Sequence, residues 1–248
     1  MAQHHDAHGS RPVDVILSIM GLFGVTLDAS AFRSTDQRGA AIALAQAILR
    51  KGGRASWLGA VFHLPPDKRL SAFPAFPQPS ASGAGRVPVT MEYPGWWLDG
   101  VPGGSMDDAG YFTFTSKAAP LVPAGASPSA APHDGGRVVN ARRSGRGATV
   151  AAIDGSMWEI QDSRVAGNGG RKHGGAFIVF LGRLEQDFRG ARARMLDTLR
   201  AILVQAHAPE RFHRISYFVL YDKWQPVIDT WEERRFSVGG GLMNRRII

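Results

Sequence analysis

Residues 74–136 are rich in proline, glycine, serine and alanine, and they separate two segments whose apolar residues follow regular patterns. Clusters of these residue types mark turns and loops rather than the interiors of helices and strands. Within the stretch we expect two short strands, at the aromatic pieces 93–97 and 111–114, among long loops. Residues 116–136 have the composition of a linker, so we expect the chain of 248 residues to fold as two compact halves.

The N-terminal segment combines a polar tail with an apolar run. Residues 1–12 contain three histidines that would suit zinc or nickel, but we expect a flexible tail without a metal site. The run Val13–Leu27 predicts a buried first strand. The alternative is a secretory signal peptide, because Ala29-Ser30-Ala31 has the small-residue pattern of a cleavage site. Asp14 interrupts the run, and fifteen residues are too few to span a bilayer comfortably, so we expect no membrane segment.

Residues 34–64 carry the clearest boundary signals of the first half. Ser34-Thr35-Asp36-Gln37 matches a capping box, with Ser34 as the N-cap of a helix. Apolar residues follow at helical spacing until Gly52-Gly53, which predicts the end of that helix. Ala55–Leu64 then predicts a second strand. Strand, helix and strand in this order begin a ferredoxin-like or similar α+β sandwich.

The second half shows patterns of the same kinds. Three apolar segments predict strands: Ala148–Ile160, Gly175–Leu184 and Ile215–Tyr221. Residues 187–206 predict a helix, because five apolar residues share one face: Met195, Leu196, Leu199, Ile202 and Leu203. We therefore expect a flexible tail at residues 1–12, one α+β domain at 13–125 and a second at 137–248.

The charge of the chain indicates an anionic partner. The formal net charge is +8, the isoelectric point is about 10.4, and the cations comprise 24 arginines but only 5 lysines. Arginine pairs bidentately with phosphate and stacks on bases, so its excess favours RNA, although a GC-rich genome would also raise the arginine content. The absence of cysteine excludes a disulfide framework, a thiol nucleophile and a thiolate zinc site. It agrees with a reducing compartment, so we expect a cytoplasmic protein.

Two glycine-rich loops concentrate positive charge, and glycine lets a phosphate approach the backbone amides. We expect RNA contacts from the cations of these loops: Arg142, Arg143, Arg146, Arg171 and Lys172. The helix predicted from residue 187 adds three more in its first turns, where the helix dipole disfavours cations unless an anion is bound: Arg189, Arg192 and Arg194. Solvated loops without a ligand are the alternative.

Residues 172–180 come close to the strand motif of RNA-recognition domains, in which Phe177 would stack on a base. Gly175 stands where that motif has an aromatic residue. An ordinary buried strand is therefore the alternative interpretation of Phe177.

The chain contains no familiar catalytic sequence motif. It lacks the HExxH, GxSxG and Walker patterns, and its carboxylates form no paired constellation, so we expect neither a metal nor another cofactor. His63, His133, His207 and His213 stand apart in the sequence and are interpreted as surface or core histidines. Phosphodiester chemistry would then be metal-independent, which RNA allows because its own 2′-hydroxyl can attack the neighbouring phosphate.

Arg33 and Arg38 are the predicted catalytic residues, because they flank the start of the first predicted helix. A guanidinium group there would stabilise negative charge on the phosphorane, an effect worth about 3 kcal/mol of barrier in comparable sites. The alternative is two exposed arginines near a helix cap.

The order of elements, the basic halves and the closing run Phe236–Leu242 (FSVGGGL) resemble the CRISPR RNA-processing endoribonucleases of the RAMP superfamily, in particular the branch found with type IV CRISPR systems. The resemblance implies two ferredoxin-like (RRM-like) domains joined by the long Pro/Gly-rich connection. It also implies that the protein binds a CRISPR repeat hairpin, cleaves precursor crRNA by 2′-hydroxyl attack and stays bound with the other subunits of an effector complex.

The glycine-rich loop of that family corresponds to Gly239, Gly240 and Gly241, with Arg245 and Arg246 as expected phosphate contacts, although a tight turn would show the same glycines. Many members of the family place a catalytic histidine after the first strand, where this chain has the two candidate arginines instead. Either an arginine carries the chemistry, or the protein is a non-catalytic RNA-binding subunit of a ribonucleoprotein. An exported or secretion-associated adaptor is the remaining alternative.

Overall fold

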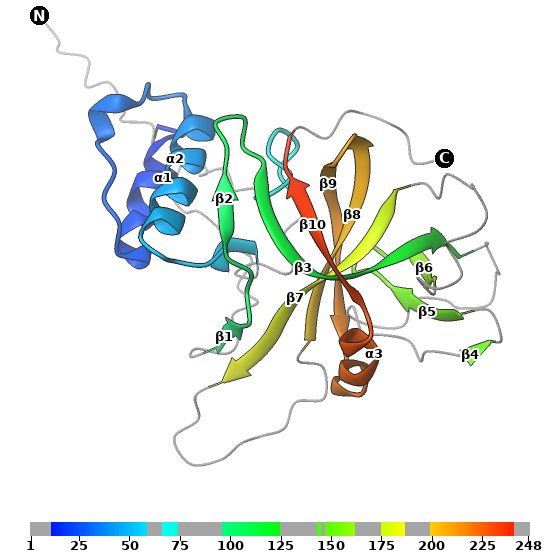
Figure 1. The fold of residues 1–248 in the computed structure, drawn as a ribbon. Helices are drawn as coiled ribbons and strands as arrows, with labels where there is room; N and C mark the ends of the chain where they lie inside the picture. The colour runs from blue at the N-terminus through cyan, green and yellow to red at the C-terminus, as the bar shows by residue number, and fades with distance from the viewer. Residues whose placement is uncertain are drawn as a thin grey trace, which may run out of the picture.

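The computed structural model describes residues 11–58, 66–73, 96–124, 143–144, 147–161, 175–186 and 199–240 (Figure 1). Within these residues a large mixed sheet forms the body of the protein, and the N-terminal helices lie against one side of it. The prediction of two ferredoxin-like domains is wrong, because strands from both halves of the chain belong to this one sheet. The predicted domain boundary, residues 126–136, lies outside the described residues.

The segment before the sheet is helical rather than extended. Apart from one longer helix, its elements are α1 (Asp14–Ile19), η1 (Met20–Phe23), η2 (Ala29–Ala31) and η3 (Ser56–Leu58). The strands predicted at Val13–Leu27 and, over residues 56–58, at Ala55–Leu64 are therefore wrong, and residues 59–65 lie outside the described part. Four apolar residues of the first segment recur every three or four positions and share one helical face within the core: Val13, Ile16, Leu17 and Met20.

Helix α2 (Gln37–Arg50) confirms the helix predicted after residue 34. Its N-cap is Asp36, whose carboxylate accepts a hydrogen bond from the Gly39 amide at 2.8 Å, rather than the predicted Ser34. The amide of Gly53 bonds back to the last turn at 2.9 Å, so the predicted glycine stop is confirmed. No helix in the described part of the chain, α2 included, is long and apolar enough to cross a membrane.

The described strands form a ten-stranded sheet in the order β1-β7-β8-β9-β10-β3-β6-β5-β4, with β2 beside β3. Their bounds are β1 (Trp96–Asp99), β2 (Gly104–Met106), β3 (Phe112–Pro123), β4 (Arg143–Ser144), β5 (Gly147–Ala151), β6 (Met157–Ile160), β7 (Ala176–Gln186), β8 (Leu199–Ala208), β9 (Arg211–Leu220) and β10 (Glu232–Val238). Strands β7 and β9 confirm two predicted strands, and the third, Ala148–Ile160, is the hairpin β5–β6.

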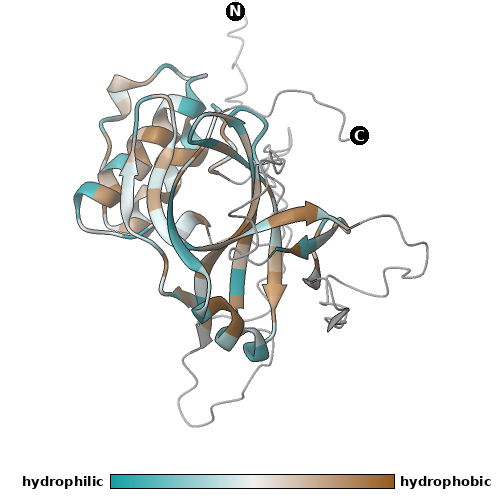
Figure 2. Ribbon diagram, turned by 45° about the vertical axis from the view of Figure 1, so that its right-hand side comes forward, coloured by the Kyte–Doolittle hydropathy of each residue, from teal (hydrophilic) through white to brown (hydrophobic). Residues whose placement is uncertain are grey.

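Strand β3 closes part of the sheet into a ring, which Figure 2 shows from one end. Phe112–Ala118 pair with β10 and Ala118–Leu121 pair with β7, so that β3, β7, β8, β9 and β10 form a closed circuit. The linker predicted at residues 116–136 is therefore wrong over Ser116–Pro123, which lies at the centre of the sheet. The small residues that suggested a linker are buried where β3 exchanges one partner for the next, at Ala118 and Ala119.

Aromatic side chains meet in the interior of the ring. The ring centroids of Phe177 on β7 and Phe236 on β10 lie 5.7 Å apart, although these two strands are not neighbours in the sheet. Phe212 on β9 contacts both of them, with centroid distances of 5.8 and 5.1 Å. Phe177 thus packs against the core while only partly buried, and its predicted role in base stacking stays a prediction.

Strand β8 corrects the helix predicted at residues 187–206. Its first six residues, Leu199–Val204, are buried, with Ile202 and Val204 in the core that contains the aromatic cluster. The intervening Leu203 belongs to a second core on the opposite face. A strand buried on both faces is apolar without alternation, so apolar residues at helical spacing arise in it by coincidence. Residues 187–198 lie outside the described part.

Helix α3 lies where β9 and β10 separate. These strands run parallel and pair only through Arg211 with Ser237 and Phe212 with Val238. The chain that connects their other ends forms η4 (Asp222–Trp224) and α3 (Gln225–Asp229). This connection buries three large side chains in the second core: Trp224, Ile228 and Trp231.

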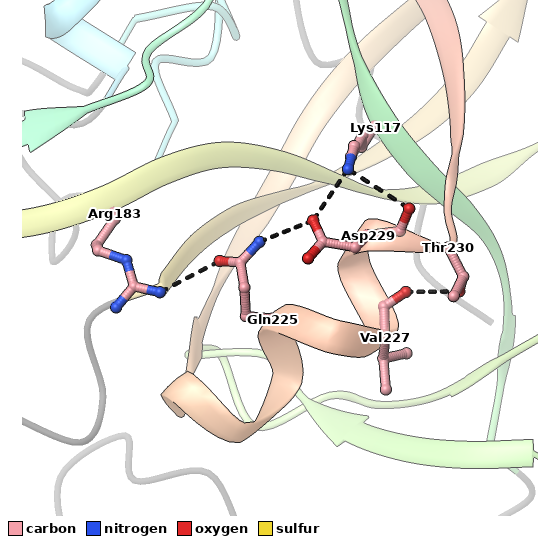
Figure 3. A network of polar contacts seen from close by, with 6 residues as sticks. All are labelled: Lys117, Arg183, Gln225, Val227, Asp229 and Thr230. Atoms are coloured by element: carbon pink, nitrogen blue, oxygen red, sulfur yellow. Dashed lines mark hydrogen bonds and ion pairs between the residues drawn. The ribbon is translucent and has the colours of Figure 1, made fainter.

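A polar network holds α3 against β3 and β7 (Figure 3). Lys117 Nζ and Gln225 Nε2 both donate to Asp229 Oδ1, each at 3.0 Å. Arg183 on β7 donates to Gln225 Oε1 at 3.3 Å and pairs with Asp222 at 3.2 Å. The hydrogen bonds from Lys117 and Gln225 hold the pKa of the Asp229 carboxyl below its usual value, so the network is complete at neutral pH.

Replacing Ile228 by alanine tests the packing of α3. Ile228 is fully buried, whereas its neighbour Val227 is 36% exposed. We expect Ile228→Ala to lower the free energy of unfolding by about 3 kcal/mol, because it leaves a cavity, and Val227→Ala to change it by less than about 0.5 kcal/mol. Urea denaturation measures both values. Equal effects would show that α3 does not pack through Ile228.

Candidate functional site

Four side chains that can exchange protons or carry positive charge gather at one end of the ring. Strands β3 and β9 begin there and β8 and β10 end there, at the top of the ring in Figure 1. We call this group the histidine cluster; its members are Tyr111, His207, Arg211 and His213. Tyr111 directly precedes β3, and the other three lie on the β8–β9 hairpin.

The β8–β9 hairpin brings the two histidines together. Its turn, Pro209-Glu210, places the end of β8 opposite the start of β9. The register shifts between Ala206 and Ala208, so His207 is the extra residue of a β-bulge. Such bulges redirect a side chain out of the regular alternation. The imidazole rings of His207 and His213 lie face to face, with centroids 3.7 Å apart and planes 7° from parallel.

Tyr111 and Arg211 complete the cluster beside His207. The Tyr111 ring is 5.9 Å from the His207 ring, and its hydroxyl oxygen is 3.4 Å from His207 Nε2. The Arg211 guanidinium carbon lies 4.4 Å from the centre of the Tyr111 ring, a cation–π geometry. Guanidinium, phenol and two imidazoles are thus in contact in that order.

The tautomer of His213 follows from its partner. Its Nδ1 lies 2.9 Å from the carbonyl oxygen of Gly239. A carbonyl only accepts hydrogen bonds, so Nδ1 carries the proton. The neutral ring then presents an unprotonated Nε2, which is available to accept a proton.

The environment of His207 favours its neutral form. Partial burial lowers the pKa of His207, and the charges of His213 and Arg211 lower it further. Because the His213 ring is stacked on His207, a charge on His213 disfavours protonation of His207. The pair therefore suits a reaction in which one imidazole acts as the base and the other, in its protonated form, as the acid.

Two of the three glycines predicted as a phosphate loop lie against this cluster. Gly239 and Gly240 are buried directly after β10, and Gly241 lies outside the described residues. A Cβ at Gly239 would collide with the backbone of Gly110 and Tyr111, and one at Gly240 would collide with the Tyr111 hydroxyl. The glycines thus allow the backbone to approach Tyr111 closely.

The structure places one of the two predicted catalytic arginines at the turn that precedes Tyr111. Arg38 on α2 is exposed and its Nη2 donates to the carbonyl of Ala109 at 3.0 Å, two residues before Tyr111. Arg33 is exposed at the turn before α2. The catalytic role predicted for Arg33 and Arg38 stays a prediction, and of the two Arg38 is hydrogen-bonded to the turn before Tyr111.

Most of the predicted RNA contacts lie outside the described residues: Arg142, Arg146, Arg171, Lys172, Arg189, Arg192, Arg194, Gly241, Arg245 and Arg246. The backbone of Arg143 belongs to β4. The helix predicted from residue 187 is a strand over residues 199–206, and its first turns, which carry three of these arginines, lie outside the described residues.

The sequence predicts His207 and His213 to be surface or core histidines. It does not predict that their rings are in contact. A usable signal is present in His207-Ala-Pro-Glu-Arg-Phe-His213, where a Pro-Glu turn has one histidine on each side. The signal becomes visible only when both flanking segments are recognised as strands of a hairpin. The helix predicted at residues 187–206 concealed it.

Comparison with protein-family models, with curated proteins and with solved structures finds no match for this chain. Within the described residues, no three histidines, cysteines or carboxylates are grouped as metal ligands would be. The function is therefore inferred from the chemistry of the histidine cluster.

Titration of His207 tests the electrostatics of the cluster. We expect NMR shifts of its ring to give a pKa below the value of about 6.5 for an unperturbed histidine, and His213→Ala to raise that pKa by removing a neighbouring charge. As the pH falls through about 6.5, the unfolded chain then takes up a proton before the folded chain does, so stability is lost. His207→Ala should reduce the fall in melting temperature between about pH 7 and pH 5. A His207 pKa at or above the ordinary value would contradict this arrangement.

Alanine at Gly240 tests the close approach to Tyr111. Gly240 has a φ of 70°, and Gly52 has a φ of 80° with open space around it, so Gly52→Ala is a matched control. Both substitutions cost about 1 kcal/mol through the left-handed backbone, but only Gly240→Ala also displaces a side chain. We expect Gly240→Ala to lower the free energy of unfolding by about 1–3 kcal/mol more than Gly52→Ala. Losses of the same size in urea denaturation would count against the contact.

Proposed function

We propose that the protein is a metal-independent endoribonuclease and that RNA is cleaved at the histidine cluster by attack of its own 2′-hydroxyl. The observation that carries this proposal is the stack of His207 and His213, flanked by Tyr111 and Arg211. Imidazoles are the side chains best suited to general acid and base catalysis near neutral pH. A guanidinium group beside them supplies positive charge for a developing phosphorane.

The environment of each histidine suggests its role. His207, with its lowered pKa, takes the proton from the 2′-hydroxyl. The 2′-oxygen attacks phosphorus, and the bond to the 5′-oxygen of the next nucleotide breaks. His213 in its protonated form donates a proton to that leaving oxygen, while Arg211 faces the charged phosphorane. The products are a 2′,3′-cyclic phosphate and a free 5′-hydroxyl, and the two histidines have exchanged protonation states.

Further cations near the cluster support a polyanionic substrate. Arg38 hydrogen-bonds the turn that leads into Tyr111. Lys68 and Arg69 are exposed on the segment 66–73, whose Ser71 hydrogen-bonds the glycines beside the cluster. Cations around a site attract phosphates and neutralise them on binding. Repeat RNA of a CRISPR system, held in an effector complex, remains a proposal for the natural substrate and is the first RNA to test.

Cleavage of a repeat hairpin in EDTA tests the proposal. We expect wild-type protein to produce a 2′,3′-cyclic phosphate. His207→Ala and His213→Ala should each lower the cleavage rate at least about 100-fold, because each removes a proton-transfer group. Arg50→Ala, an exposed cation at the end of α2, is the control and should cleave at the wild-type rate.

A 2′-deoxy nucleotide on the 5′ side of the cut should abolish cleavage by the wild-type protein. Full activity of both histidine variants, or cleavage of the deoxy analogue, would refute the proposed mechanism. Salt-sensitive binding without any cleavage would favour the non-catalytic RNA-binding subunit.

A further inference from the structure

The segment 66–73 holds the two glycines that support the histidine cluster. Ser71 is fully buried, and its amide donates to the carbonyl of Gly240 at 3.0 Å. Its hydroxyl donates to the carbonyl of Gly239, also at 3.0 Å. Ser71 therefore binds two consecutive carbonyls of the turn after β10, from a segment far away in the sequence.

The carbonyl oxygen of Gly239 receives two hydrogen bonds. One comes from the Ser71 hydroxyl at 3.0 Å and the other from His213 Nδ1 at 2.9 Å. A carbonyl oxygen has two lone pairs, so both are used. The amide of Gly239 donates to the carbonyl of Phe212 at 2.9 Å, which restrains the other side of the same residue. The acceptor of the His213 proton is thus held in one position.

Arg214 sets the direction of the Ser71 hydroxyl. The Arg214 amide lies 3.3 Å from Ser71 Oγ and donates to it, so the hydroxyl proton is left to point at Gly239. The Arg214 side chain is fully buried, and its Nη2 donates to the carbonyl of Phe73 at 2.6 Å. Its guanidinium carbon also lies 4.8 Å from the centre of the Tyr217 ring. Backbone and side chain of Arg214 therefore both anchor the segment that carries Ser71.

We propose that Ser71 is a positioning residue for His213: through the Gly239 carbonyl it fixes the Nδ1–H tautomer and leaves Nε2 as the nitrogen that exchanges protons. The catalytic consequence rests on the proposed function, but the tautomer does not. Without the hydroxyl, the Gly239 carbonyl has one restraint fewer, and the His213 ring can rotate and exchange its tautomer. A small misplacement of a proton-transfer group is costly to the rate.

Long-range ¹H–¹⁵N spectra of protein labelled at histidine show which ring nitrogen carries the proton. We expect wild-type His213 to be predominantly the Nδ1–H tautomer, and Ser71→Ala to give a mixture of both tautomers. Ser237→Ala is the matched control, because Ser237 lies two residues before Gly239 and its partly buried hydroxyl accepts a hydrogen bond from the Thr113 hydroxyl at 3.2 Å. It should leave the His213 spectrum unchanged. A wild-type His213 in the Nε2–H form overturns the proposal whether or not the variant folds, and so does a folded Ser71→Ala variant with the wild-type tautomer.

Cleavage rates separate this inference from the function on which it rests. In the repeat-hairpin assay we expect Ser71→Ala to lower kcat about 10-fold with KM within about twofold, because positioning affects the reaction more than binding. Ser237→Ala should keep both constants. If no variant or wild-type protein cleaves RNA, the proposed function fails while the tautomer result still decides the role of Ser71. If wild-type protein cleaves and Ser71→Ala cleaves equally well, the positioning role fails alone.

Discussion

The change of partner along β3 is the constraint on which the rest of the structure depends. Its first residues pair with β10, and from Ala118 onward it pairs with β7, which closes five strands into a ring. Closure lets strands that are not neighbours share one interior, where Phe177 and Phe236 meet. It also brings four strand ends to one place. Tyr111 and His207, nearly a hundred residues apart in the sequence, are adjacent for that reason.

Local patterns predicted the elements that are stabilised locally. Helix α2 has apolar residues on one face and glycines at its end, and β7 and β9 have apolar runs of strand length. Strand β8 was mistaken for a helix, because burial on both faces removes the alternation that distinguishes a strand. The second part of β3 was mistaken for a linker, since small residues are common in linkers and also where strands converge. The pairing order of the strands is decided by contacts between residues that are distant in sequence.

The candidate site shows the same division. Composition indicates a cationic protein and favours arginines as candidate site residues. Of these, Arg38 bonds to the turn before Tyr111. The contact between His207 and His213 depends on the register of β8 and β9 and on one bulge. A bulge adds a single residue, and nothing in the local sequence specifies on which strand it falls. The Ser71 contact with Gly239 joins residues 168 positions apart in the sequence, so no local pattern indicates it.

The short parallel joint between β9 and β10 affects how often this part of the folded molecule opens. Among the described residues, the backbone pairing of that joint comprises two residue pairs and the Gly239–Phe212 hydrogen bond, to which the side chain of His213 adds its bond to Gly239. Regions with few backbone hydrogen bonds open more often than the body of a domain. Transient opening there would separate the hairpin from Gly239 while the remaining strands stay paired. Such local opening would break the His213–Gly239 hydrogen bond without unfolding the rest of the sheet.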